Sequence, residues 1–259
     1  MLSFSHPFIV DGQKGFDSMR TPLRGILAIP ILLGVLPLAA LATVVPCFAQ
    51  APPAPGARFV VVLDAAHGGD ENGAQLALSG DPKQTQPEKA FALAFSVRLR
   101  SLLVARGITV VATRDGDSAM DADHRAETAN RAKAQACLSL HASTSGSGAH
   151  LYISSLAPAE PARLAAWKTV QAAWVTRSLA LAGSLNAALT HAGVPVTLGR
   201  TALPGLDSMA CPAVAVELAP VLATSHMQAA ALDDPAYQVR VADAVAAALV
   251  EWRSEAPQP

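Results

Sequence analysis

Short apolar runs alternate with longer amphipathic stretches between residues 58 and 253. The short runs predict strands at 59–63, 108–112, 136–140, 149–154 and 213–216. The longer stretches predict helices at 87–106, 121–133 and 235–252, with one long or two broken helices at 161–191. Strands that alternate with helices favour an α/β fold with an open, mainly parallel or mixed sheet and helices on both faces, in a single catalytic domain.

The ends of the predicted helix at 87–106 are well marked. Pro87 and Glu88 open it and Gly107 follows it, which is the usual distribution of proline and glycine at helix ends. The segment before it, 74–86, is polar and is predicted to be a loop. The last residues, 254–259, are expected to form a disordered tail.

Residues 1–50 have the pattern of an N-terminal extension and a signal peptide. A positively charged segment starts at Met19, an apolar run covers 25–45, and small residues end at Ala49. The true start is therefore predicted at Met19 and cleavage after Ala49. We expect an exported protein, periplasmic or associated with the cell wall, without stable membrane insertion after cleavage. An uncleaved N-terminal anchor is the alternative, because the run is long enough to span a bilayer. Residues 51–57 form a proline-rich linker to the catalytic domain at 58–253.

Composition and charge exclude one class of partner. The 259 residues are 51% hydrophobic and 15% charged, with a mean hydropathy of +0.33, and part of this apolar excess lies in the leader. The formal net charge is −1, so the chain as a whole lacks the positive field that attracts nucleic acid. Nucleic acid is therefore not an expected partner.

Four residues with metal-binding or acid–base side chains stand at the ends of predicted elements. His67, His141 and Glu217 close strands, and Glu88 opens a helix. The carboxyl ends of parallel strands meet at one edge of a sheet, and the helix after a strand begins at that edge. Gly68 and Gly69 allow a turn with positive φ beside His67.

Two imidazoles and one carboxylate are the ligand set of a catalytic zinc site, which keeps a fourth position for water. Zinc lowers the pKa of that water toward about 7. A second carboxylate that is not a ligand can accept the proton of the water and pass it to a leaving amine. The pattern thus predicts His67, Glu88 and His141 as ligands of one Zn²⁺ and Glu217 as the catalytic group.

Each of these residues also has a structural explanation. A lone histidine after a strand is often a hydrogen-bonded structural residue, and the helix dipole alone favours Glu88 at a helix start. A carboxylate at Glu217 is harder to explain structurally, because its segment is apolar. The sequence favours salt bridges and helix caps for four further polar residues, and surface or structural roles for the remaining histidines of the domain. The four polar residues are Arg114, Asp117, Arg125 and Asn130, and the histidines are His124, His150, His191 and His226.

Two cysteines lie within the predicted domain. Cys137 falls in a strand and Cys211 just before another. Cysteines of an exported protein can form a disulfide. A buried cysteine in an apolar strand is more often a small core residue, and this is the interpretation that the sequence favours for Cys137.

The chain from Arg58 to Trp252 resembles the zinc-dependent N-acetylmuramoyl-L-alanine amidases, which cleave bacterial peptidoglycan. The resemblance rests on Asp64-Ala-Ala-His67-Gly-Gly, on Glu88-Lys at a helix start, and on Ser139-Leu-His141-Ala. Further matches are Arg106-Gly107, Thr113-Arg114-Asp115, Arg125 with Ala129-Asn130, and Pro212-Ala-Val-Ala-Val-Glu217. The resemblance implies that His67, Glu88 and His141 bind zinc and that Glu217 is the general acid/base. It also implies hydrolysis of the bond between the lactyl group of N-acetylmuramic acid and L-alanine.

The sequence departs from the family pattern at three places. Ala65-Ala66 replace a Pro-Gly pair, Ser143 replaces an asparagine, and Leu-Ala-Pro-Val-Leu-Ala follows Glu217 where a Gly-Phe step is usual. The expected role is cell wall remodelling, daughter-cell separation or recycling, with peptidoglycan as partner. An activator protein is a further candidate partner, and 159–191 is the segment where a blocking helix would be sought. The alternatives are a catalytically idle peptidoglycan-binding descendant and an exported zinc peptidase that cleaves another amide bond.

Overall fold

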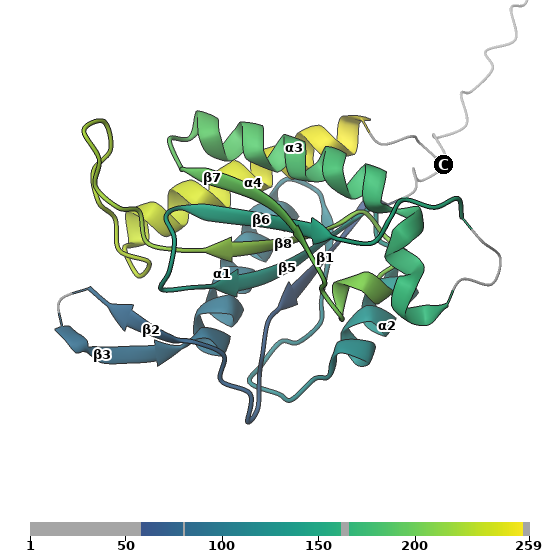
Figure 1. The fold of residues 1–259 in the computed structure, drawn as a ribbon, viewed down its shortest axis with the longest axis horizontal. Helices are drawn as coiled ribbons and strands as arrows, with labels where there is room; N and C mark the ends of the chain where they lie inside the picture. The colour runs from purple at the N-terminus through teal and green to yellow at the C-terminus, as the bar shows by residue number, and fades with distance from the viewer. Residues whose placement is uncertain (1–57, 80, 162–165, 256–259) are drawn as a thin grey trace, which may run out of the picture. The chain divides into compact units, whose positions relative to one another are not determined.

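The computed structural model describes residues 58–79, 81–161 and 166–255, and its centre is a six-stranded sheet (Figure 1). Four neighbouring strands are parallel to one another and lie in the order β4-β1-β5-β8. They are β4 (Thr109–Ala112), β1 (Val60–Ala65), β5 (Ala136–Ala142) and β8 (Ala213–Leu218). Each of them lies where the apolar runs predict a strand, and their carboxyl ends share one edge.

The other two strands of this sheet run in the opposite direction. β6 (Ala149–Ser154) pairs antiparallel with β8, and β7 (Val196–Thr201) pairs parallel with β6 at the outer edge. The predicted open α/β fold with a mainly parallel or mixed sheet is confirmed. β7 was not predicted, because its residues are half-buried or exposed and it lacks an apolar run.

Helices cover both faces of the sheet, as predicted. The larger core holds Leu63, Leu138 and Val214 against α1 (Glu88–Ala105), α3 (Val175–His191) and α4 (Pro235–Glu255). The smaller core holds Val62, Cys137 and Ala213 on the opposite face, toward α2 (Ala122–Ala132) and the 3₁₀ turn η2 (Leu206–Ser208). Successive strand residues point to opposite faces, so the same short runs supply both cores.

Two sequence predictions need correction, and a third is decided between its alternatives. Segment 74–86 was predicted to be a loop but contains the strand β2 (Gln75–Leu78), which forms an antiparallel hairpin with β3 (Asp81–Pro87). Among the described side chains of this hairpin, only that of Leu76 is fully buried. Of the two alternatives for 161–191, the broken one is confirmed: the 3₁₀ helix η1 (Trp167–Ala173) precedes α3, and 162–165 lie outside the described residues. The predicted tail begins too early, because α4 continues through Ser254 to Glu255.

Cys137 and Cys211 form a disulfide, so the interpretation of Cys137 as a free core cysteine is wrong. Cys137 lies in β5 and Cys211 in the turn before β8, and their Cα atoms are 6.2 Å apart, within the usual range for a bridge. Pairing of β5 with β8 brings together two residues that are 74 positions apart in the sequence.

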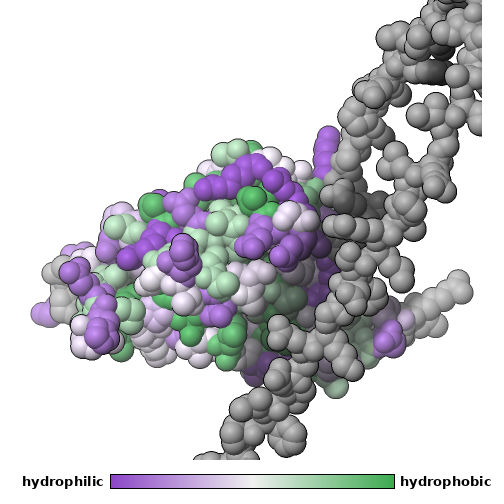
Figure 2. Space-filling view, turned by 90° about the horizontal axis from the view of Figure 1, so that it is seen from above, coloured by the Kyte–Doolittle hydropathy of each residue, from purple (hydrophilic) through white to green (hydrophobic). Residues whose placement is uncertain are grey.

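The predicted signal peptide, its cleavage site, the start at Met19 and the linker all fall on residues 1–57, outside the described residues. Among the described helices, none combines the length and apolar character needed to cross a membrane. Figure 2 shows hydrophilic and hydrophobic residues interleaved over the described part of one face of the molecule.

Candidate metal centre

His67 lies in a tight turn directly after β1. Its backbone has a φ of 58°, in the left-handed region that is uncommon for a residue with a side chain. Gly68 and Gly69 follow with φ of 136° and 60°, so the predicted positive φ is confirmed. Two backbone hydrogen bonds between Gly68 and Glu71, 3.0 and 3.2 Å long, close the turn. The loop therefore fixes the direction of the imidazole.

Glu88 is the first residue of α1, and its carboxylate is buried with 7% of the side chain exposed. The backbone N–H groups of Ala74 and Ala142 donate to its two oxygens at 3.0 and 3.1 Å. Burial by itself raises the pKa of this carboxyl, but the hydrogen bonds with His141 and with these N–H groups outweigh burial and lower the pKa to about 2. Glu88 is thus ionised at neutral pH.

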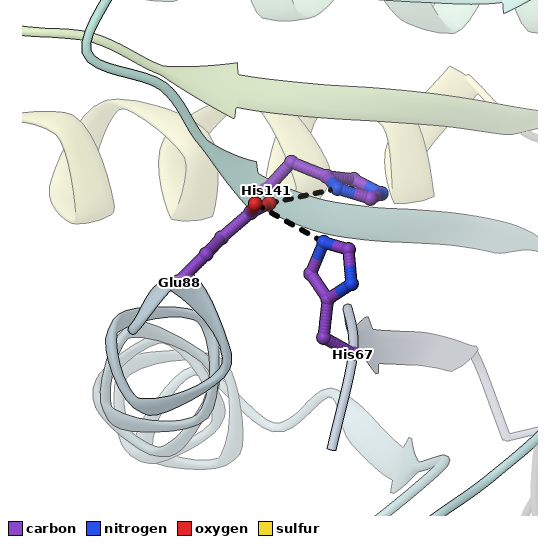
Figure 3. Close-up of side chains that lie close together, drawn as sticks. All are labelled: His67, Glu88 and His141. Carbon is purple, nitrogen blue, oxygen red and sulfur yellow. Dashed lines mark hydrogen bonds and ion pairs between the residues drawn. The ribbon is translucent and has the colours of Figure 1, made fainter. Parts of the chain in front are cut away.

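The Glu88 carboxylate lies between the two imidazoles (Figure 3). Oε2 is 3.1 Å from Nε2 of His67, and Oε1 is 3.0 Å from Nδ1 of His141. One ligand atom from each of the three residues lies within 4.8 Å of the others. The structure therefore brings the predicted ligand set together from a turn, a helix start and the end of β5.

Hydrogen bonds behind His141 set the orientation of its ring. Ser139 Oγ donates to Oδ2 of Asp64 at 2.8 Å, because an ionised carboxylate can only accept. The Ser139 oxygen is 3.2 Å from Nε2 of His141 and can accept its hydrogen, so Nε2 has a partner on the side of the ring away from Glu88. Nδ1 is the nitrogen that faces the Glu88 carboxylate, 3.0 Å from Oε1.

The site fits a divalent cation for two reasons. Nδ1 of His141 and Oε1 of Glu88 lie 3.0 Å apart, close enough to bind one cation together, and the ionised Glu88 carboxylate supplies negative charge to it. Gly73 also leaves space beside the cluster: a Cβ there would lie 2.6 Å from both Glu88 Oε2 and His67 Cδ2. The His₂Glu set with space around it is the donor set of catalytic zinc sites.

Two buried arginines hold the His67 turn in place. Arg125 donates to Oδ1 of Asp64 at 2.6 Å and to the carbonyl oxygen of His67 at 2.7 Å. Arg114 donates to the carbonyl oxygens of Ala65 and Ala66 at 2.9 and 2.8 Å, and burial together with the neighbouring Arg125 lowers its pKa. The two alanines that depart from the family pattern thus present their carbonyls to these arginines.

Asp117 and Asn130 also have structural partners. Asp117 forms an ion pair of 2.9 Å with Lys89 and accepts from the backbone N–H of Gly69 at 2.8 Å. The Asn130 side chain donates to the carbonyl of Ser208 at 3.0 Å and accepts from the N–H of Ala210 at 2.6 Å. Structural roles were favoured for these residues and for both arginines. Asn130, however, links two segments and does not cap a helix.

Glu217 lies in β8 beside His141 in β5, since the two residues are paired in the parallel register. Neighbouring strands are about 4.8 Å apart, so both side chains leave the same face at the same edge. His150 in β6 is the antiparallel partner of Glu217, and its Nδ1 lies 3.0 Å from Glu217 Oε1. His150 was predicted to be a surface or structural residue. The sequence spacing gave no sign of this contact, because it depends on the reversed direction of β6.

A cavity of about 510 Å³ adjoins the cluster. His67, Ser139 and His141 line one part of it, and Met120, Leu203 and Leu206 line another. No described residue between 159 and 191 lines it. The cluster is therefore open to a molecule larger than water.

Comparison with known proteins points to one family. A family model described as N-acetylmuramoyl-L-alanine amidase matches residues 61–251. The N-acetylmuramoyl-L-alanine amidase Rv3717 of Mycobacterium tuberculosis is 33% identical over 207 residues, which cover 73% of this chain and 83% of that protein.

Solved structures show the same architecture. The catalytic domain of CwlV, an N-acetylmuramoyl-L-alanine amidase from Bacillus (Paenibacillus) polymyxa, aligns with a TM-score of 0.56 and 26% identity, over 76% of this chain and 98% of that one. The amidase Ami1 of Mycobacterium smegmatis aligns with a TM-score of 0.57 and 21% identity, over 76% and 98%. The second likeness concerns the fold alone.

Proposed function

The chain belongs to the N-acetylmuramoyl-L-alanine amidase family, and from that membership we propose that it is a zinc-dependent enzyme of peptidoglycan. Its reaction is hydrolysis of the amide bond between the lactyl group of N-acetylmuramic acid and L-alanine. The observation that carries the metal requirement is the convergence of His67, Glu88 and His141, with Nδ1 of His141 3.0 Å from the Glu88 carboxylate. These three residues would hold one zinc ion.

When bound, zinc supplies a Lewis acid that polarises the substrate carbonyl and lowers the pKa of a water molecule. The Glu217 carboxylate accepts a proton from that water as the water oxygen adds to the lactyl carbonyl carbon. Glu217 then gives the proton to the amide nitrogen while the carbon–nitrogen bond breaks. The products are a lactyl carboxylate and the free amino group of L-alanine.

Action outside the cytoplasm is part of the proposal. The Cys137–Cys211 disulfide supports it, because such bridges persist in oxidising compartments and are rare in reducing ones. A signal peptide in residues 1–50 and periplasmic or wall-associated placement remain predictions. So do an activator protein and a role in wall remodelling, daughter-cell separation or recycling.

The test measures zinc content and hydrolysis of purified wall sacculi for the parent protein and for Glu217→Gln. We expect about one zinc in both proteins and hydrolysis by the parent alone, because Gln keeps the shape of Glu but cannot accept a proton. Glu251→Gln, an exposed carboxylate in α4, is the matched control and should keep full activity.

Chemical identification of the new ends tests which bond is cut. Lactyl carboxyl groups and L-alanine amino ends in equal amounts are the expected products. A cut within the stem peptide would replace the proposal with the exported zinc peptidase. Binding of sacculi without any new ends would replace it with the idle peptidoglycan-binding descendant. Absence of zinc from the active parent would show that the ligand assignment is wrong.

A further inference from the structure

Three side chains form a row across the carboxyl edge of the sheet. His141 in β5 pairs with Glu217 in β8, and Glu217 pairs with His150 in β6. Paired residues on neighbouring strands point to the same face of a sheet. Glu217 therefore has a metal-ligand candidate on one side and a second imidazole on the other. His150 reaches this edge because β6 runs antiparallel to β8 and begins there.

The contact between His150 and Glu217 is partly shielded from water. The His150 side chain is 11% exposed and the Glu217 side chain 30%. Nδ1 of His150 lies 3.0 Å from Oε1 of Glu217, and an ionised carboxylate can only accept, so the imidazole donates its Nδ1 hydrogen. A charge-assisted hydrogen bond of this kind is stronger than one between neutral groups.

The turn before β6 leaves space for this imidazole. Gly146 has a φ of 87°, and a Cβ at that position would lie 2.0 Å from Cε1 of His150. The ring of Tyr152 lies edge-on to His150, with 6.4 Å between the ring centres. The ring is thus held between a glycine turn, a tyrosine and the Glu217 carboxylate.

We propose that His150 is a positioning residue that fixes the Glu217 carboxylate for proton transfer. The inference rests on the proposed role of Glu217 as general acid/base. A free glutamate side chain loses rotamer entropy when it is fixed, and a hydrogen bond that already fixes one oxygen removes part of this cost from the reaction. His150 holds Oε1, and the other oxygen is left to accept the proton of the attacking water.

The hydrogen bond between His150 and Glu217 can be tested by replacing His150 with two different amide side chains. The amide nitrogen of asparagine can take the place of Nδ1 of histidine, whereas that of glutamine corresponds to Nε2. His150→Asn therefore keeps a donor toward Glu217, and His150→Gln displaces it. We expect His150→Asn to retain kcat within roughly five-fold, and His150→Gln and His150→Leu to lose on the order of 10- to 100-fold. KM and zinc content should not change, since the hydrogen bond of His150 is to Glu217 and His150 does not line the cavity.

The control is His191, an exposed histidine at the end of α3. His191→Asn and His191→Gln should leave kcat unchanged. Thermal unfolding of every variant separates loss of positioning from loss of folding, because a folding defect would lower kcat in proportion to the folded fraction. Equal kcat for His150→Asn and His150→Gln, whether both are high or both are low, would overturn the proposal.

A spectroscopic measurement separates this inference from the proposed function. In nitrogen NMR spectra of the ring, His150 should carry its hydrogen on Nδ1, and its signals should move in Glu217→Gln. Unmoved signals would overturn the His150 contact whatever the enzyme does. Moved signals together with full activity of Glu217→Gln would instead show that the role proposed for Glu217 fails, and the positioning role with it.

Discussion

Gly73 is the residue whose lack of a side chain matters most to the metal centre. It has a φ of 67°, and an added Cβ would lie 2.6 Å from both Glu88 Oε2 and His67 Cδ2. We expect Gly73→Ala to lower zinc affinity on the order of 10- to 100-fold, because the methyl group displaces two ligands at once. Equilibrium zinc titration against a competing chelator measures this directly.

Gly183 provides the control, since it lies within α3 and a Cβ there would meet nothing within 4 Å. Gly183→Ala should leave zinc affinity unchanged and raise the free energy of unfolding by roughly 0.5–1 kcal/mol, because alanine favours a helix. Equal zinc affinity in both variants would mean that the loop of Gly73 moves freely around the site.

Asp64 is the buried anion on which the site is built. It accepts from Arg125 at 2.6 Å, from Thr113 at 2.7 Å and from Ser139 at 2.8 Å. Asp64→Asn removes the charge that pairs with a buried guanidinium, and breaking a buried pair costs about 3–5 kcal/mol. Urea unfolding should show this loss in the free energy of unfolding. Glu127→Gln, which breaks an exposed pair with Arg131, should cost about 0–1 kcal/mol. Similar losses in the two variants would contradict the central role of Asp64.

At the scale of elements, the direction of β6 separates what the sequence could predict from what it could not. His67, Glu88 and His141 stand at ends of elements that follow the βα alternation, so their meeting at one edge follows from the pattern. The place of His150 depends on β6 running against β8, and an apolar run such as Ala149–Ser154 carries no sign of its direction. The hairpin of β2 and β3 was not predicted for another reason: its strands are mostly exposed, so apolar residues do not recur along them at the spacing of a strand.

The disulfide joins β5 to the turn that leads into β8, the two strands that carry His141 and Glu217. It closes a loop of 74 residues, for which restriction of the unfolded chain gives about 4 kcal/mol of stability. We expect Cys137→Ala with Cys211→Ala to lower the free energy of unfolding by about 2–5 kcal/mol in urea. A reducing agent should destabilise the parent and leave the double variant unaffected. An equal effect of the reducing agent on both would contradict this assignment.

At the scale of the whole molecule, the sequence predicts the fold better than it predicts the position of the segment after Glu217. Apolar runs specify the parallel strands, and the helices that cover them are marked by proline, glycine and acidic residues. The Leu-Ala-Pro segment that replaces the family pattern has no periodicity of its own, and its position is set by tertiary contacts. Tyr237 in α4 donates to the carbonyl of Ala219 at 2.9 Å and so links this segment to the larger core.

The same tyrosine should make the stability of the whole domain depend on pH under alkaline conditions. Burial raises the pKa of Tyr237 to about 12, and the positive charge of Arg240 opposes this only in part. In the unfolded chain the phenol ionises near pH 10. The stability contribution is therefore complete below about pH 10 and is lost as the pH rises toward 12, because the unfolded state releases its proton first.

The free energy of unfolding in urea should accordingly fall by about 1 kcal/mol between pH 9 and 11 through this group alone. Tyr237→Phe should cost about 1 kcal/mol at pH 8, because the Ala219 carbonyl loses its donor, and should then vary less with pH than the parent. Tyr152→Phe is the control and should keep the alkaline slope of the parent. If Tyr237→Phe kept that slope as well, other groups would control the alkaline stability, and the segment after Glu217 would not be tied to α4 in the way that the structure shows.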